Sequence, residues 1–155
     1  MPHFSNESKA RLATCHADLQ LLFNVVVKYF DCKILYGGRQ PSYQFELFKK
    51  GREEINGKWV VTAKAEVVTN CDGFKKLSDH NYKPSRAVDA VPFPIDFNNI
   101  RRQIYFAGYV LGVARILKRA NKIKHEIRWG GDWNDDTFIK DTRFLDFPHF
   151  YIYIK

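Results

Sequence analysis

Apolar residues return every three or four positions in three stretches of the chain, which is the spacing of a helix with one buried face. The first stretch covers residues 8–30 and predicts one continuous helix. A second helix is predicted from Pro41, which suits a first helical turn, to Gly51, with Tyr43, Leu47 and Phe48 facing inward. A third is predicted over residues 100–121, with Asn99 as its cap and much of the basic charge on its polar face.

Four shorter segments have the pattern of strands. Residues 33–36 are apolar and run into two glycines, residues 85–93 alternate with a period of two, and residues 124–129 and 148–154 follow the third helix. Residues 53–73 are harder to assign, because WVVTAKAEVV fits either one strand or two short ones and the flanking Asn and Gly residues indicate loops. This order of elements predicts an α+β fold, in which about three helices pack on a mostly antiparallel sheet. A length of 155 residues fits one domain spanning residues 1–155.

Composition and charge narrow the class of protein. Lys and Arg total 25 against 17 acidic residues, so the net charge is +8 and attraction to a polyanion is expected. Nucleic acid, anionic cell-envelope polymers and lipid headgroups all meet this condition, and no single basic tract marks a nucleic-acid arm. Three cysteines without a CxxC spacing indicate neither a disulfide framework nor a cysteine zinc site.

The chain shows no sign of a membrane span or of a secretory signal. Its apolar runs are interrupted well before the ~20 residues that a span requires, so stable membrane insertion is not expected. The first twenty residues lack a basic segment followed by an apolar one, so we expect no signal peptide and synthesis that ends in the cytoplasm.

The strongest chemical signal is a histidine and an aspartate nine residues apart around a proline turn, His80 and Asp89. Asp89 lies in an apolar strand, where an unpaired carboxylate would cost several kcal/mol. It therefore predicts either a metal ligand or a salt bridge to Arg39 or Arg86. His149 opens the last strand and shares a face with two tyrosines, and it can supply a third ligand, which is the number that catalytic zinc sites use beside water.

Other polar residues offer weaker candidates. Asp146, three residues before His149, is close enough to reach a water on such a metal, or it is simply an exposed loop residue. We expect the remaining histidines, His3, His16 and His125, to be surface or packing residues.

A second cation site is a further possibility. Asp132, Asn134 and Asp136 alternate as in the first half of a calcium loop, but the later bidentate glutamate is missing. A turn with Trp133 packed beneath it is the alternative.

Three motifs in order, SDH, SRAVD and DFPH, resemble those of the zinc peptidases that cleave peptidoglycan stem peptides. This family contains D-alanyl-D-alanine carboxypeptidases and phage L-alanyl-D-glutamate endopeptidases, and its fold is the hedgehog/DD-peptidase type. The resemblance covers nearly the whole chain. It implies that His80, Asp89 and His149 hold Zn²⁺, that Asp146 is the catalytic acid/base and that Arg39 lies near the substrate. The spacing departs from the commonest form by two extra residues, in the NYKPSR segment.

The resemblance also implies a biological setting. A short chain of this kind is similar to phage endolysins, which wait in the host cytoplasm and cut the L-alanyl-D-glutamate bond of peptidoglycan once the inner membrane is breached. We expect a monomer whose positive charge favours anionic envelope polymers, with no nucleic acid partner. The nearest rival is a D-alanyl-D-alanine carboxypeptidase. From another class, a basic nucleic-acid-binding module with incidental histidines would bind DNA in a salt-dependent way and carry no zinc.

Overall fold

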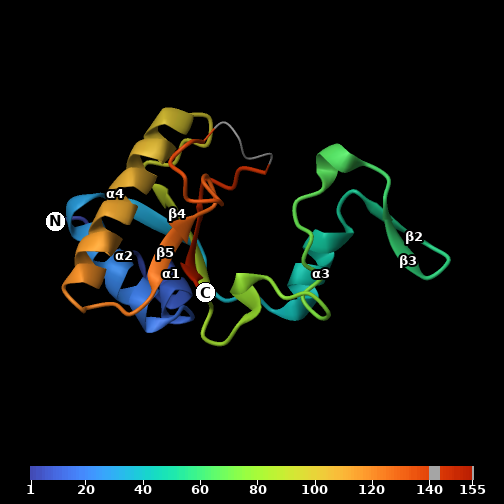
Figure 1. Cartoon of the computed structure of the whole chain (residues 1–155), viewed down its shortest axis with the longest axis horizontal. Helices are drawn as coiled ribbons and strands as arrows, with labels where there is room; N and C mark the ends of the chain where they lie inside the picture. Colours follow the sequence, from blue (N-terminus) through green and yellow to red (C-terminus); the bar gives the residue numbers. More distant parts are fainter. Residues whose placement is uncertain (140–143, 155) are drawn as a thin grey trace.

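The computed structural model describes residues 1–139 and 144–154, and within these the chain has an α+β fold (Figure 1). Its elements, in chain order, are α1 (Asn6–Ala13), α2 (Ala17–Tyr29), β1 (Cys32–Tyr36), α3 (Pro41–Lys49), β2 (Arg52–Ile55), β3 (Lys58–Val61), η1 (Lys64–Glu66), η2 (Asp79–Asn81), β4 (Ala87–Pro92), α4 (Ile100–Arg119), β5 (Glu126–Trp129) and β6 (His149–Tyr153). None of the described helices has the length and apolarity needed to cross a bilayer.

The central sheet has the strand order β1-β4-β6-β5, and each neighbouring pair is antiparallel. Helices α1, α2 and α4 gather on the side of the molecule that holds this sheet (Figure 1). The core between them is aromatic: Phe150 of β6 meets Phe23 of α2 edge-on, with ring centroids 5.5 Å apart, and Phe106 of α4 at 6.1 Å. All three phenylalanines are fully buried, so β6 is held firmly at the centre of the sheet.

Helix α3 and the hairpin of β2 and β3 form a separate lobe beside the main body (Figure 1). The hairpin turns at Asn56 and Gly57, both of which have positive φ, as a two-residue turn of the primed type requires. Of the segment WVVTAKAEVV, residues 59–61 belong to β3 and residues 64–66 to η1, so it holds one short strand followed by a turn of 3₁₀ helix. Phe45 lies edge-on to Trp59 at 5.6 Å and to Phe74 at 5.9 Å, so the lobe has a small aromatic cluster of its own.

Two details of the predicted helices are wrong. The first helix is broken at residues 14–16, because the backbone there bonds to a distant segment: the Ser85 N–H donates to Thr14 O, and the His16 N–H donates to Ser85 O. Helix α3 turns Gln44 inward, whereas Tyr43 is 45% exposed. Its inner face meets polar groups of residues 69–71, so an amide packs there better than an aromatic ring.

Candidate metal centre

His80 is held by the short helix η2, which begins at a reciprocal cap. The Ser78 hydroxyl accepts the His80 N–H, while the Asn81 side chain accepts the Ser78 N–H. The imidazole is 2% exposed, and its Nδ1 lies 2.7 Å from the carbonyl oxygen of Gly37. Because a carbonyl only accepts, Nδ1 carries a proton, and Nε2 is the nitrogen that faces Asp89 and His149. His80 is therefore oriented to offer Nε2 to a metal.

Asp89 and His149 face each other across neighbouring strands. They are register partners in the antiparallel pair of β4 and β6, where the side chains of opposed residues adjoin. His149 Nδ1 lies 3.1 Å from Asp89 Oδ1. His80 Nε2 lies 3.2 Å from both of these atoms, so three donor atoms from η2, β4 and β6 form a nearly equilateral triangle.

The triangle fits a zinc ion. With Zn–N bonds of about 2.0–2.1 Å, neighbouring ligand atoms of a tetrahedral site lie about 3.3–3.4 Å apart. The measured separations of 3.1–3.2 Å are close to this value. The bond from His80 Nδ1 to Gly37 is the outer-shell contact that fixes a ligating histidine. These three residues also form one of the groups of metal-ligating side chains among the described residues.

Electrostatics keep Asp89 ionised. Burial acts to raise its pKa, but His80 and His149 outweigh burial and hold the pKa of this carboxyl well below its usual range. Burial acts to lower the pKa of His149, yet the hydrogen bond with Asp89 raises it overall. The second carboxylate oxygen, Oδ2, lies 3.5 Å from Arg39 Nη2, whereas Arg86 stacks on the Tyr82 ring. Of the alternatives raised by its sequence context, the ion pair is formed with Arg39, and the role of Asp89 as a metal ligand stays a prediction.

Arg39 follows β1 and is held from both sides. Its N–H donates to His80 O at 2.7 Å, and its carbonyl accepts from Asn81 Nδ2 at 3.0 Å, so the arginine is tied to η2. Its Nη1 donates to Gln44 Oε1 at 3.0 Å, and its Nε is buried without a partner among the described residues. Gln44 is fully buried and donates in turn to Thr69 Oγ1 and to Cys71 O. A search for apolar residues alone misses Gln44. It could have been found as a polar residue at the position where the helical spacing predicts a buried side chain.

Asp146 lies at the edge of the same site. Its N–H donates to Gly130 O at 2.9 Å, and the His149 N–H donates to Asp146 O at 3.1 Å, so a tight turn carries the chain from Asp146 into β6. Gly130 permits this approach, because a Cβ there would lie 2.6 Å from Asp146 O. Burial is the main cause that raises the pKa of the Asp146 carboxyl, and nearby Asp89 adds to it while His149 opposes it.

These groups line one cleft of about 520 Å³ between the sheet and the α3 lobe. Its walls include Tyr36 and Tyr43, stacked with ring centroids 6.4 Å apart, and Trp133, whose ring lies 5.5 Å from that of His149. Lys50 adds a cation at the rim. The cleft combines aromatic walls, side chains of both charges and the three convergent donor atoms.

The connection between His80 and Asp89 is longer than the common form of the motif, yet it is well anchored. The Arg86 N–H donates to Asp79 O at 2.9 Å, which closes residues 79–86 into a loop. Ser85 is fully buried, and its hydroxyl donates to Ala87 O at 2.7 Å. The two extra residues therefore leave the positions of both candidate ligands intact.

The candidate calcium residues lie in the turn after β5. Asp132 accepts the backbone N–H groups of Asp136 and Thr137, and Asp136 accepts that of Phe138 and the side-chain amide of Asn134. The carboxylates thus cap their own loop, and Trp133 packs against the rings of His149 and Tyr151. These contacts fit the alternative of a turn with Trp133 beneath it, and a calcium site stays a prediction.

Comparison with known proteins gives a match in structure. No protein-family model and no curated protein sequence matches the chain. Among solved structures, the crystal structure of the L-Ala D-Glu endopeptidase ChiX from Serratia marcescens is similar, with a TM-score of 0.57 and 17% sequence identity over 98% of this chain and 91% of that chain. At this level of identity the likeness shows a shared fold, and the α+β architecture predicted from the sequence is thereby confirmed.

Proposed function

We propose that this protein is a zinc-dependent peptidoglycan endopeptidase that hydrolyses the L-alanyl-D-glutamate bond of the stem peptide. The observation that carries the proposal is the triangle of His80 Nε2, Asp89 Oδ1 and His149 Nδ1, with sides of 3.1–3.2 Å, on the floor of a cleft. The fold shared with a protein of this activity and the three sequence motifs add support. Two imidazoles and one carboxylate form a ligand set that leaves a position for water, as catalytic zinc sites do.

A zinc ion in this triangle supplies Lewis-acid chemistry, by lowering the pKa of a water towards ~7 and polarising the scissile carbonyl. Asp146 accepts a proton from the attacking water and returns it to the leaving amine, a role worth roughly 10² to 10⁴ in rate. The raised pKa of its carboxyl suits a group that must both take and return a proton. Gly130 and the turn into β6 hold Asp146 at the required edge of the cleft.

Arg39 is the candidate for binding negative charge on the substrate. Gln44 and Asp89 engage its two terminal nitrogens, at 3.0 and 3.5 Å, and this fixes the plane of the guanidinium. The guanidinium lines the cleft, and each terminal nitrogen has a second N–H that needs an oxygen acceptor from the substrate. A stem-peptide carboxylate or the developing oxyanion meets that need.

The decisive experiment is mass spectrometry of the fragments released from purified peptidoglycan by the zinc-loaded protein. We expect peptides that begin with D-glutamate, together with glycan chains that retain L-alanine. Release of terminal D-alanine instead would identify a D-alanyl-D-alanine carboxypeptidase built on the same site. Absence of bound zinc together with salt-dependent DNA affinity would favour the nucleic-acid-binding alternative.

The proposal includes a role in host cell lysis, in which the protein acts on the wall as a monomer after the inner membrane is breached. A net charge of +8 supports it, because anionic envelope polymers concentrate a cationic enzyme at the wall. Addition of the protein to permeabilised bacterial cells should lower their turbidity, and light scattering during gel filtration should give the mass of one chain. Intact turbidity despite active cleavage of purified peptidoglycan would remove the lytic role.

A further inference from the structure

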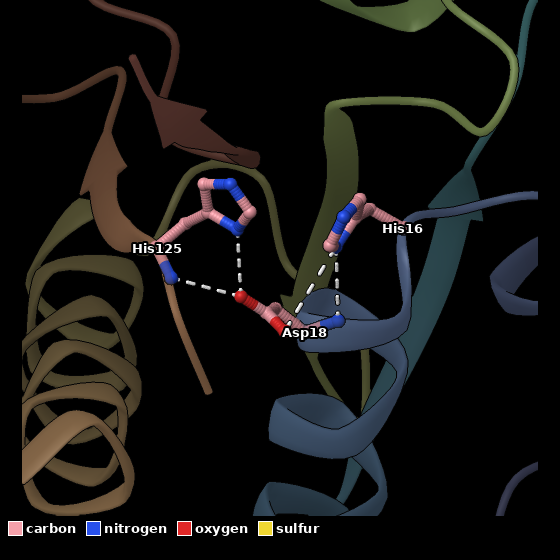
Figure 2. Close-up of side chains that lie close together, drawn as sticks. All are labelled: His16, Asp18 and His125. Atoms are coloured by element: carbon pink, nitrogen blue, oxygen red, sulfur yellow. Dashed lines mark hydrogen bonds and ion pairs between the residues drawn. The ribbon is translucent and has the colours of Figure 1, made fainter. Parts of the chain in front are cut away.

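A second group of metal-ligating side chains lies away from the cleft: His16, Asp18 and His125 (Figure 2). His16 is the cap residue before α2, Asp18 lies in the first turn of that helix, and His125 immediately precedes β5. Their donor atoms all lie within 4.8 Å of one another. None of the three lines the cleft that holds His80, Asp89 and His149.

The carboxylate of Asp18 is fixed by the backbone. The side chain is 10% exposed, and its Oδ2 accepts the N–H groups of Lys124 and His125, each at 2.9 Å. Burial acts to raise the pKa of Asp18, but these bonds and the His125 side chain outweigh burial and lower the pKa, so the group is ionised at neutral pH. The carboxylate is therefore both charged and held in place.

The two imidazoles converge on this carboxylate from opposite sides (Figure 2). His125 Nδ1 lies 2.8 Å from Asp18 Oδ2, and His16 Nδ1 lies 4.0 Å from Asp18 Oδ1. His16 Nδ1 accepts the Asp18 N–H at 3.1 Å, so this nitrogen is unprotonated, and a metal ion would take the place of that N–H as its partner. The rings stand edge to face, with centroids 4.9 Å apart.

From this arrangement we propose that His16, Asp18 and His125 form a second, structural binding site for a divalent transition metal such as zinc. The separations of 2.8 and 4.0 Å lie on either side of the about 3.3–3.4 Å between ligand atoms of tetrahedral zinc. Binding would therefore require both imidazoles to rotate, with the metal replacing the proton on His125 Nδ1 and the Asp18 N–H on His16 Nδ1. The backbone bonds to Asp18 Oδ2 act as outer-shell support.

The surroundings select the kind of ion. A hollow of about 210 Å³, lined by His16, His125, Lys83 and Arg86 among others, opens beside the cluster and leaves room for water or an anion as a further ligand. The imidazoles are 30% and 35% exposed, so an ion can enter from solvent. Imidazole suits zinc, nickel and copper, whereas calcium and magnesium require more oxygen ligands than the one carboxylate here provides.

A metal here would join two segments that are distant in sequence, and a backbone bond links one of them to a third. His16 and Asp18 open α2, His125 ends the connection from α4 to β5, and the His16 N–H donates to Ser85 O at 2.8 Å. Ser85 lies in the loop between His80 and Asp89. The second site therefore stabilises the framework on which the cleft is built, and it is independent of the reaction that occurs there.

The test is a zinc titration against a chromophoric chelator, with metal content checked by elemental analysis. We expect two equivalents in the wild type and one in His16→Asn, because an asparagine still caps α2 through its side-chain oxygen but lacks the imidazole. In the double variant His80→Ala/His149→Ala we expect one equivalent. Adding His125→Gln should lower the zinc affinity of this remaining site by roughly 100-fold or more, since even changes to residues that support a ligand cost 10- to 100-fold. The exposed His3, replaced in His3→Ala, is the matched control and should change neither number.

Thermal unfolding gives a second readout. Zinc should raise the melting temperature of the His80→Ala/His149→Ala variant, and this rise should vanish when His16→Asn is added. Circular dichroism checks that each variant is folded. One equivalent in the wild type would overturn the proposal. So would a zinc affinity that His16→Asn and His125→Gln leave unchanged from that of their parent proteins, and the Asp18 contacts would then only join α2 to the start of β5. His16→Asn should keep peptidoglycan cleavage, so failure of this site and failure of the proposed function are separable.

Discussion

The carbonyl of Gly37 accepts a hydrogen bond from His80 Nδ1 at 2.7 Å, and this bond decides which nitrogen His80 offers to the cleft. Gly37 follows directly after β1, and its Cα is packed so closely that an added Cβ would collide with Arg11 O and the Thr14 hydroxyl. The carbonyl can reach His80 only because position 37 carries no side chain. A glycine thus controls the geometry of the candidate metal centre.

Gly37→Ala should therefore weaken both stability and zinc binding. We expect a loss of about 1–3 kcal/mol in the free energy of unfolding, as for other overpacked positions. We also expect lower zinc affinity, because β1 must move and the His80 imidazole loses its orientation. Denaturant unfolding of the zinc-free protein and chelator competition measure the two effects. Gly108→Ala is the matched control: nothing lies within 4 Å of an added Cβ in α4, so it should leave both quantities unchanged or slightly raise stability.

Asp146→Asn should separate metal binding from catalysis. Its side chain lies outside the triangle of donor atoms, so zinc should stay bound, while hydrolysis of peptidoglycan should fall by roughly 10² to 10⁴ through loss of the proton acceptor. Asp96→Asn is a suitable control, because this exposed carboxylate accepts the Asn98 N–H within its own turn and lies outside the cleft. Near-wild-type turnover by the Asp146 variant would remove this residue from the mechanism. Loss of zinc would make it a ligand instead.

The three free cysteines should differ sharply in reactivity. Cys15 and Cys32 are almost fully buried, and burial raises the pKa of each thiol to about 12. At pH 8 roughly one molecule in 10⁴ would then carry the thiolate that reacts. Burial also raises the pKa of Cys71, but this residue is only half-buried and lines the cleft.

Iodoacetamide at pH 8 should therefore label the native protein once, at Cys71, and label all three cysteines after unfolding. Peptide mass mapping identifies the labelled position. Cys71→Ser should abolish the fast reaction, and a bulky reagent on Cys71 should slow peptidoglycan cleavage by filling the cleft. Rapid modification of Cys15 or Cys32 in the folded protein would contradict the burial of these two thiols.

The sequence predicted the elements whose pattern is local. The alternation before Pro92 marked β4, the apolar stripe marked α4 with its Asn99 cap, and the final alternation marked β6. Asp89 and His149 could be singled out because each is a polar group in one of these apolar strands. Their pairing across β4 and β6 is then a consequence of antiparallel register.

Local sequence patterns do not predict contacts between distant segments. The break between α1 and α2 arises from backbone bonds of Thr14 and His16 with Ser85, and periodicity passes through it unchanged because both helices face the same core. The same holds for the second cluster: His16 and His125 were expected to be surface or packing residues, and only the approach of α2 to the start of β5 places them around Asp18.

Gln44 positions Arg39 and does not itself need to touch the substrate. It is fully buried, accepts from Arg39 Nη1 at 3.0 Å and donates to Cys71 O at 3.0 Å. Gln44→Leu removes all of these bonds and leaves buried polar groups unsatisfied, which should cost about 1–3 kcal/mol in the free energy of unfolding. Arg39 then loses its orientation, so KM for stem peptides should rise more than kcat falls, while zinc affinity is unchanged.

Gln40→Leu is the matched control, since Gln40 precedes the same helix, is exposed and makes no side-chain cap bond. Gln44→Glu separates positioning from packing: it keeps an acceptor for Arg39 but loses the donor to Cys71 O. Its KM should therefore lie closer to that of the wild type than the KM of Gln44→Leu does, while its free energy of unfolding stays below the wild-type value. Steady-state kinetics at several substrate concentrations give KM and kcat separately. An unchanged KM in a folded Gln44→Leu protein would show that Arg39 binds no part of the substrate, or that it is held in place without Gln44.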